Sequence, residues 1–157
     1  MQIMMLELHN VTIGQQIHSL SMALSDGQQV NITGQKGSGK TTLLRALLGF
    51  IPVDGGHICI DGELLTPMSA PYFRKHMAYV PQYLTLPEGY DGVSTDYLQL
   101  LRQAVDSGKT LLIVDEPSQE LSEEDRQTVD SMLMVAMQRG AVLVAVNSRF
   151  MQNQVSL

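Results

Sequence analysis

The sequence predicts an α/β fold with a mostly parallel core sheet flanked by helices, plus a small antiparallel β layer at the N-terminal end. Three observations lead to this prediction. After residue 28, strand-like and helix-like segments alternate. Residues 110–114 and 141–146 are almost wholly apolar, as expected for strands buried on both faces of a parallel sheet. Before residue 28, residues 4–9 and 17–24 alternate between apolar and polar, which predicts strands with one exposed face.

Composition narrows the class of protein. With 157 residues, 44% of them hydrophobic, the chain predicts a single folded domain over residues 1–157. No apolar run approaches the roughly 20 residues that span a bilayer, and the first ten residues lack the pattern of a signal peptide. The net charge is −6, with the acidic excess in the second half, which argues against nucleic acid as a partner. The one cysteine, Cys59, fits a reducing compartment.

Turn and cap signals divide the chain into elements. Residues 25–27 form a turn before a strand that leads into a glycine-rich loop. Gly49 and Pro52 stop the helix after that loop. Pro81 ends a short strand, and a glycine ends each of the two later helices. The expected elements are a strand at 28–33, a helix at 40–50, a strand at 57–65 with a turn at 61–62, a strand at 76–80, a helix at 94–108, a strand at 110–114, a helix at 122–139 and a strand at 141–146.

The last predicted helix shows both its start and its buried face. Ser122 with Asp125 resembles a capping box. Apolar residues then recur at helical spacing, which predicts a stripe that packs against the rest of the protein. The stripe consists of Val129, Met132, Leu133 and Ala136.

A glycine-rich loop carries the first functional motif. Residues 34–41, GQKGSGKT, match the phosphate-binding pattern G-x-x-x-x-G-K-[ST]. Its glycines let the backbone turn tightly, so that successive N–H groups can face phosphate oxygens next to a helix N-terminus. Lys40 can reach the outer phosphates, and Thr41 can place its hydroxyl on Mg²⁺. The residues expected to bind the cofactor are Gly34, Gln35, Lys36, Gly37, Ser38, Gly39, Lys40, Thr41 and Thr42.

A second motif, LLIVDEP, covers residues 111–117. An apolar strand that ends in Asp115 would carry this carboxylate to the carboxyl edge of the sheet, where parallel sheets bind their ligands. Asp115 could then hold Mg²⁺, and Glu116 beside it could take a proton from an attacking water. An acidic pair after a strand is weak evidence alone, but the upstream phosphate loop strengthens it.

These motifs make the chain resemble the nucleotide-binding domain of ATP-binding cassette (ABC) ATPases. The resemblance covers nearly the whole chain, and its motifs are highly specific in combination. Gln82 falls on the glutamine of the family's glutamine loop. The segments that carry the resemblance are residues 6–13, 24–65, 73–82 and 111–121.

The resemblance implies an ATP and Mg²⁺ site and assigns roles to its residues. Lys40, Gln82 and Glu116 would be catalytic. Thr41, Gln82 and Asp115 would hold the metal. It also implies dimers that close over two ATP molecules, each held between one subunit's phosphate loop and the other subunit's signature motif.

The segment between the glutamine loop and the second motif is shorter than in the family. Only 32 residues separate Gln82 from Asp115, whereas family members carry a helical subdomain there with a signature of the LSGGQ type. Aligning the helix before Asp115 with the family places DGVST, residues 91–95, over the signature. We therefore expect the helical subdomain to be largely absent and the signature to be degenerate.

Three further family features are replaced. Ser148, or Asn147 beside it, stands where the family has its switch histidine, and neither can take up a proton near neutral pH. No aromatic residue occurs in residues 1–48, where the family stacks one on adenine. Ser122 stands where the family offers an aspartate across the dimer.

The family pattern thus predicts an ATP-binding, ABC-type ATPase subunit on the cytoplasmic face of a membrane, coupled to a permease subunit and weakly active alone. Its protein partner would be a second copy or another ABC ATPase subunit. The alternative is a nucleotide-binding sensor or regulator with little or no hydrolysis, which the lost signature and histidine favour. A purely structural partner is the least supported reading, because the phosphate loop is intact.

Overall fold

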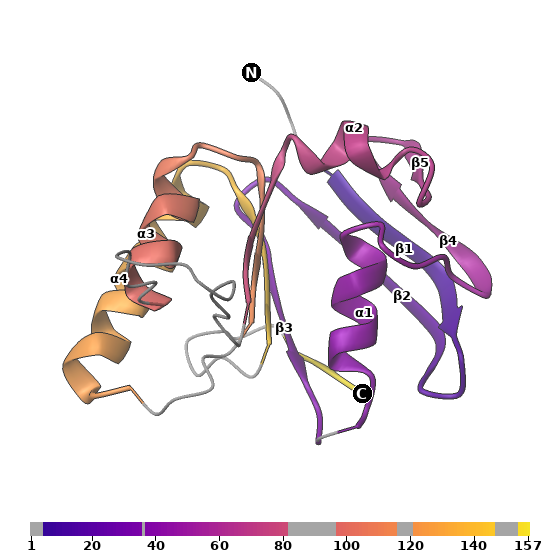
Figure 1. The fold of residues 1–157 in the computed structure, drawn as a ribbon, viewed down its shortest axis with the longest axis horizontal. Coiled ribbons are helices and arrows are strands. Elements are labelled where there is room, and N and C mark those ends of the chain that lie inside the picture. Colours follow the sequence, from indigo (N-terminus) through magenta and orange to yellow (C-terminus); the bar gives the residue numbers. More distant parts are fainter. Residues whose placement is uncertain (1–4, 36, 82–96, 116–120, 147–153) are drawn as a thin grey trace, which may run out of the picture.

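The computed structural model of the chain describes residues 5–35, 37–81, 97–115, 121–146 and 154–157. Its elements form two sheets, with helices packed between and beside them (Figure 1). In chain order they are β1 (Met5–Ile13), β2 (Ile17–Ser25), β3 (Gln29–Thr33), α1 (Lys40–Leu47), β4 (Gly55–Ile60), β5 (Glu63–Leu65), α2 (Ala70–Arg74), β6 (Met77–Val80), α3 (Tyr97–Asp106), β7 (Leu111–Val114), α4 (Glu123–Gln138), β8 (Val142–Val146) and β9 (Gln154–Ser156).

The two sheets confirm the predicted fold class. One sheet has the strand order β6-β7-β8-β3-β9, and its neighbouring strands are parallel. The other has the order β2-β1-β4-β5, and its neighbours are antiparallel. They are called here the parallel sheet and the antiparallel sheet. The antiparallel sheet is the small N-terminal β layer that the alternating segments predict.

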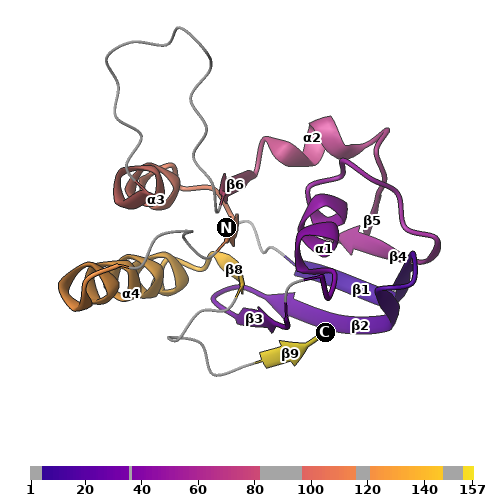
Figure 2. The same ribbon diagram turned by 60° about the horizontal axis from the view of Figure 1, so that its bottom comes forward.

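Helix α1 lies between the two sheets, whereas α3 and α4 lie on the other face of the parallel sheet (Figures 1 and 2). The buried side chains of α1, among them Leu43, Leu44 and Leu47, belong to one core with residues of both sheets, such as Leu8 and Val144. Burying apolar surface is the main favourable term in folding. Because α1 is covered from two sides, its position relative to both sheets is fixed.

The parallel sheet is covered on both faces, which explains its apolar strands. Along β7, Ile113 packs into the core around α1, and Leu112 packs into a second core with α3 and α4. The predicted stripe of α4 is confirmed, because Leu133 and Ala136 are buried in this second core. Val129 and Met132, the other members of the stripe, pack against it and are partly buried.

Two elements were not predicted. Helix α2 has five residues and β9 has three, so neither is long enough to show a clear periodic pattern. Contacts with distant segments determine both: Phe73 of α2 is buried in the core around α1, and β9 pairs in parallel with the edge of β3.

The C-terminal end of α1 confirms Gly49 as a stop signal. Gly49 has a φ of 79°, in the left-handed region, and a Cβ there would lie 2.2 Å from the Cβ of Ala70. From α2, the Arg74 side chain donates to the Leu48 carbonyl at 2.9 Å and stacks 4.2 Å from the centre of the Phe50 ring. A cation is favourable at this end of a helix. Arg74 and Gly49 therefore end α1 and hold α2 against it.

We predict that Leu44→Ala lowers the free energy of unfolding by about 2–5 kcal/mol, the usual result of opening a cavity in a packed core. Leu44 is 1% exposed, in the middle of the α1 core. Met134→Ala, at a site that is 45% exposed on α4, is the control and should change this free energy by less than about 0.5 kcal/mol. Urea denaturation measures both. Equal effects of the two substitutions would show that α1 is not the buried centre of the fold.

Candidate functional site

The two motif-bearing strands end at the same edge of the parallel sheet. β3 and β7 both pair with β8, in registers that place Asn31 and Val114 level with Ala145. Asp115 follows Val114 directly, and the glycine-rich loop begins just after β3. The carboxyl edge of a parallel sheet is where such folds bind their ligands. The predicted loop and the predicted carboxylate therefore share this edge, with one strand between them.

The backbone of the loop explains its glycines. Gly37 and Gly39 have φ angles of 85° and 106°, in the left-handed region that favours glycine. A Cβ on Gly34 would lie 2.4 Å from the Oγ of Ser38. A side chain at Gly34 would therefore force the Ser38 side chain to move.

Positive charge gathers where the loop meets α1. Gly39 is the N-cap and provides no side-chain cap, and the first N–H groups of a helix have no partner within the helix. The ammonium group of Lys40 donates to the carbonyl oxygens of Gly34 and Gln35, the latter at 3.0 Å. The loop thus combines a helix N-terminus with a cation, an arrangement that attracts anions.

Gln16, in the turn between β1 and β2, braces the loop against α1. Its Nε2 donates to the Gly37 carbonyl at 3.0 Å, and its Oε1 accepts from the Thr42 hydroxyl at 3.1 Å. A Cβ on Gly39 would lie 2.9 Å from the Cβ of Gln16, so the two segments are in close contact. The role of Gln16 was not predicted from the sequence, because a glutamine in a surface turn belongs to no motif.

The donor groups of the loop suit a phosphate. Within the described part of the chain, the buried Oγ of Ser38 has no hydrogen-bond partner, and an unpaired buried hydroxyl is costly. A phosphate oxygen could accept from it, from the N–H groups at the start of α1 and from the Lys40 ammonium. Thr41 is exposed in the same first turn of the helix.

Asp115 is held through its backbone from two sides. Its side chain and backbone together are only 7% exposed. Its N–H donates to the Val80 carbonyl of β6 at 2.9 Å, and its carbonyl oxygen accepts from the hydroxyl of Tyr97. Tyr97 is buried in the first turn of α3. Nothing near Tyr97 in the sequence indicates this long-range bond, so the role of Tyr97 was not predicted.

A metal at this edge would need oxygen atoms from its substrate. No three His, Cys, Asp or Glu side chains among the described residues are grouped as a metal site. Mg²⁺ does not require such a group, because it is usually held by one or two carboxylates, waters and substrate phosphates. The Asp115 carboxylate and the Thr41 hydroxyl fit this pattern.

Tyr79, on β6, lies within the electrostatic field of the site. Burial raises the pKa of its phenol, the negative charge of Asp115 raises this pKa further, and Arg45 on α1 lowers it. An anion nearby disfavours the phenolate, and a cation favours it. The titration of Tyr79 therefore reports on the charges of Asp115 and Arg45.

Several predicted residues lie outside the part of the chain that the structure describes. They are Lys36, Gln82, Glu116, residues 91–95, Asn147 and Ser148. Ser122 is described, and its Oγ accepts from the Asp125 N–H at 3.1 Å as the N-cap of α4.

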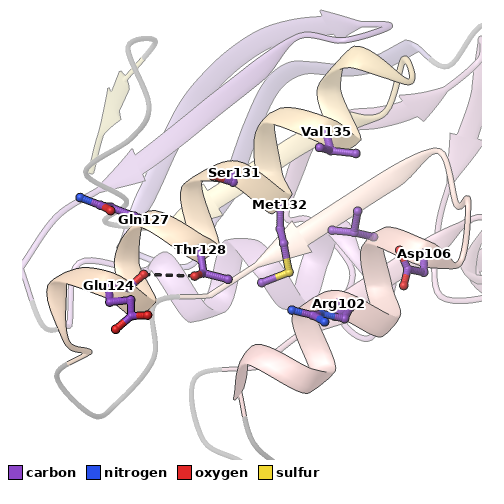
Figure 3. Close-up of a pocket in the computed structure, with 9 residues that line it drawn as sticks. Arg102, Asp106, Glu124, Gln127, Thr128, Ser131, Met132 and Val135 are labelled. Atoms are coloured by element: carbon purple, nitrogen blue, oxygen red, sulfur yellow. Dashed lines mark hydrogen bonds between the residues drawn. The ribbon is translucent and has the colours of Figure 1, made fainter.

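A groove of about 650 Å³ lies between α3 and α4 (Figure 3). Its walls combine the charged side chains of Arg102, Asp106 and Glu124 with the apolar ones of Met132 and Val135. It lies on the face of the parallel sheet opposite α1 (Figure 1). No predicted site residue lines it, so this groove is separate from the phosphate loop.

Comparison with known proteins gives one consistent family. A family model described as ABC transporter matches residues 17–144. The ABC multidrug transporter lscH of Purpureocillium lilacinum is 30% identical over 163 residues, an alignment that covers 97% of this chain and 10% of that protein. The chain spans 32% or less of the length of other curated relatives that it matches.

Solved structures share the fold at low sequence identity. An ATP-binding subunit of an ABC transporter superposes with a TM-score of 0.80 and 18% identity, over 98% of this chain and 85% of that one. A dimeric ATP-binding cassette bound to ADP and Pi superposes with a TM-score of 0.76 and 16% identity, over 97% and 94% of the two chains. Among the helices that the structure describes, none is long and apolar enough to cross a membrane.

We predict that Asp115→Asn lowers the pKa of Tyr79, because it removes the negative charge that disfavours the phenolate. Arg45→Ala should have the opposite sign and raise this pKa. Phenolate absorbance against pH, with Tyr79→Phe subtracted to isolate one group, measures both shifts. Asp106→Asn, in the α3–α4 groove, is the charge-matched control. An unchanged Tyr79 titration in Asp115→Asn would place the carboxylate away from the phenol.

Proposed function

Because this chain belongs to the ABC transporter family, we propose that it binds ATP with Mg²⁺ and hydrolyses it in the service of a membrane transporter. The observation that carries the proposal is the phosphate loop, placed between β3 and α1 at the sheet edge that also holds Asp115. We further propose that residues 1–157 act as a single domain. The chain would work at the cytoplasmic face of the membrane.

Each residue of the site has a proposed role. The loop N–H groups and the Ser38 hydroxyl would hold the phosphates. Lys40 would exchange its bonds to the Gly34 and Gln35 carbonyls for bonds to the outer phosphate oxygens. A charged donor makes a stronger hydrogen bond with an ionised acceptor than with a neutral carbonyl. The contribution of Lys40 to phosphate binding would therefore be the difference between these two sets of bonds.

The metal and the attacking water complete the proposed reaction. Thr41, Asp115 and Gln82 would hold Mg²⁺, which when bound neutralises charge on the phosphate oxygens. Glu116 would take a proton from the water that attacks the γ-phosphorus. The bond from that phosphorus to the bridging oxygen then breaks, and ADP leaves with the bonding electron pair. Hydrogen bonds from β6 and α3 hold the backbone of Asp115, the residue directly before Glu116 in the sequence.

Pairing with another ATP-binding subunit is part of the proposal. A relative with the same fold is described as a dimer in a post-hydrolysis state bound to ADP and Pi. In a homodimer of this chain, DGVST at residues 91–95 would face each nucleotide in place of an LSGGQ-type signature. We therefore propose slow turnover by the chain alone and faster turnover beside a subunit with an intact signature. A membrane permease would be the third component.

A nucleotide sensor with little or no hydrolysis is the second candidate function. The observation that favours it is the sequence at residues 147–148, where Asn and Ser replace the family's switch histidine. Occupancy by ATP would then change a binding surface without turnover. The presence of Glu116 opposes this reading, because a sensor has no need of a general base.

We predict that Lys40→Ala raises the Kd for Mg²⁺-ATP by about ten- to a hundredfold, because hydrogen bonds to charged groups contribute about 1.5–3 kcal/mol. Calorimetric titration measures both affinities. Lys75→Ala is the matched control, since it removes the same charge from an exposed position next to α2. The phosphate-cradle role of the loop is wrong if Lys40→Ala binds ATP as tightly as the unmodified chain.

Glu116→Gln is predicted to lower ATP turnover about a hundredfold or more, the usual contribution of a general base, while leaving Mg²⁺-ATP affinity within about threefold. Phosphate release, measured across a range of protein concentrations and with an ABC subunit of intact signature added, tests this. Turnover in the unmodified chain that Glu116→Gln abolishes supports the ATPase. ATP binding with no turnover under any of these conditions favours the sensor instead.

A further inference from the structure

Four side chains with metal-binding atoms lie side by side on the outer face of the antiparallel sheet. β1 and β4 are neighbours, in a register that sets Glu7 opposite Cys59 and His9 opposite His57. Leu8, between Glu7 and His9, points into the core and is 1% exposed. Successive side chains of a strand point to opposite faces. The four residues therefore share the face that is turned away from α1.

The side chains are within reach of one another. The ring centres of His9 and His57 are 4.7 Å apart, and His9 Nε2 lies 3.0 Å from Glu7 Oε2. The His9 and Glu7 side chains are 46% and 26% exposed, so an ion could approach from solvent. Opposite residues of a strand pair have Cβ atoms about 4.5–5.5 Å apart, and next-but-one residues lie about 7 Å apart along a strand. The four residues thus mark the corners of a small rectangle.

Gly56 fixes the backbone on which this rectangle is built. It has a φ of 70°, and a Cβ there would lie 2.2 Å from the carbonyl oxygens of both His9 and Asn10. Only glycine fits at this position, because β1 and β4 approach closely here. The register of the two strands keeps His57 opposite His9, and a site that uses all four side chains requires them to rotate until their donor atoms meet.

We propose that Glu7, His9, His57 and Cys59 form a binding site for a divalent transition-metal ion, with Zn²⁺ as the best match. Two imidazoles, a thiolate and a carboxylate make a four-coordinate shell of the kind that zinc takes. Mg²⁺ and Ca²⁺ prefer oxygen atoms and match this set poorly.

The site is not formed in advance. In the described conformation no three of the four side chains are grouped as a metal site, because His9 bonds to Glu7 and the His9 and His57 rings lie together at an interplanar angle of 30°. An incoming ion replaces the bond between His9 and Glu7, and the Cys59 thiol releases its proton to solvent. This proposal does not rest on the proposed ATPase function, since none of these residues belongs to the phosphate loop.

Titration with Co²⁺ tests the site, because a thiolate bound to this ion gives a charge-transfer absorption. The purified chain, without nucleotide or Mg²⁺, should bind one Co²⁺ and lose the absorption when Zn²⁺ is added. His57→Ala should weaken binding at least about tenfold, since even partners outside the ligand shell contribute this much. Cys59→Ser should remove the charge-transfer band.

His18→Ala is the matched control, because His18 is exposed on β2 and its ring bonds to the Gln15 carbonyl, away from the cluster. Zn²⁺ should raise the thermal midpoint of the unmodified chain and of His18→Ala, but not of His57→Ala. Thermal midpoints without metal show whether each variant folds. No Co²⁺ band in the unmodified chain, a band that survives Cys59→Ser, or equal losses in His18→Ala and His57→Ala would overturn the proposal.

Discussion

The burial of α1 between two sheets is the constraint on which the rest of the structure depends. Leu43, Leu44 and Leu47 are at most 1% exposed, so the helix cannot shift along its axis without exposing apolar surface or opening cavities. Its start is left with N–H groups that no side chain caps. The packing of the leucines stabilises this unfavourable arrangement, and Gln16 adds hydrogen bonds to the loop at Gly37 and to the helix at Thr42.

The acidic part of the site is held by different means. The backbone of Asp115 is bound from β6 and from α3, and the charge of its carboxylate raises the pKa of the Tyr79 phenol. Across β8 from this carboxylate lies a loop rich in donors. If Asp115 binds a cation and the loop binds a phosphate, as proposed, this one edge can hold both at once, without either binding event having to assemble the other half.

Local patterns predicted most of the fold, whereas contacts between distant segments escaped prediction. The apolar runs at 110–114 and 141–146 indicate a buried parallel sheet, because a strand that is buried on both faces has apolar residues at nearly every position. Ser122 was recognisable as an N-cap for a similarly local reason. Gln16 and Tyr97 each act through one side chain on a segment far along the chain, and nothing near them in sequence reveals it. The roles of Gln82 and Glu116 stay predictions.

The hydrogen bonds of Gln16 couple the antiparallel sheet to the phosphate loop. One side chain at the tip of a surface hairpin bonds to the loop at Gly37 and to the helix behind it at Thr42. The same hairpin lies close to Gly39, where the loop becomes helix, since a Cβ on Gly39 would be 2.9 Å from the Cβ of Gln16. A partner that binds this hairpin would therefore act on the loop. A displacement of the hairpin tip would strain the backbone that would surround a phosphate.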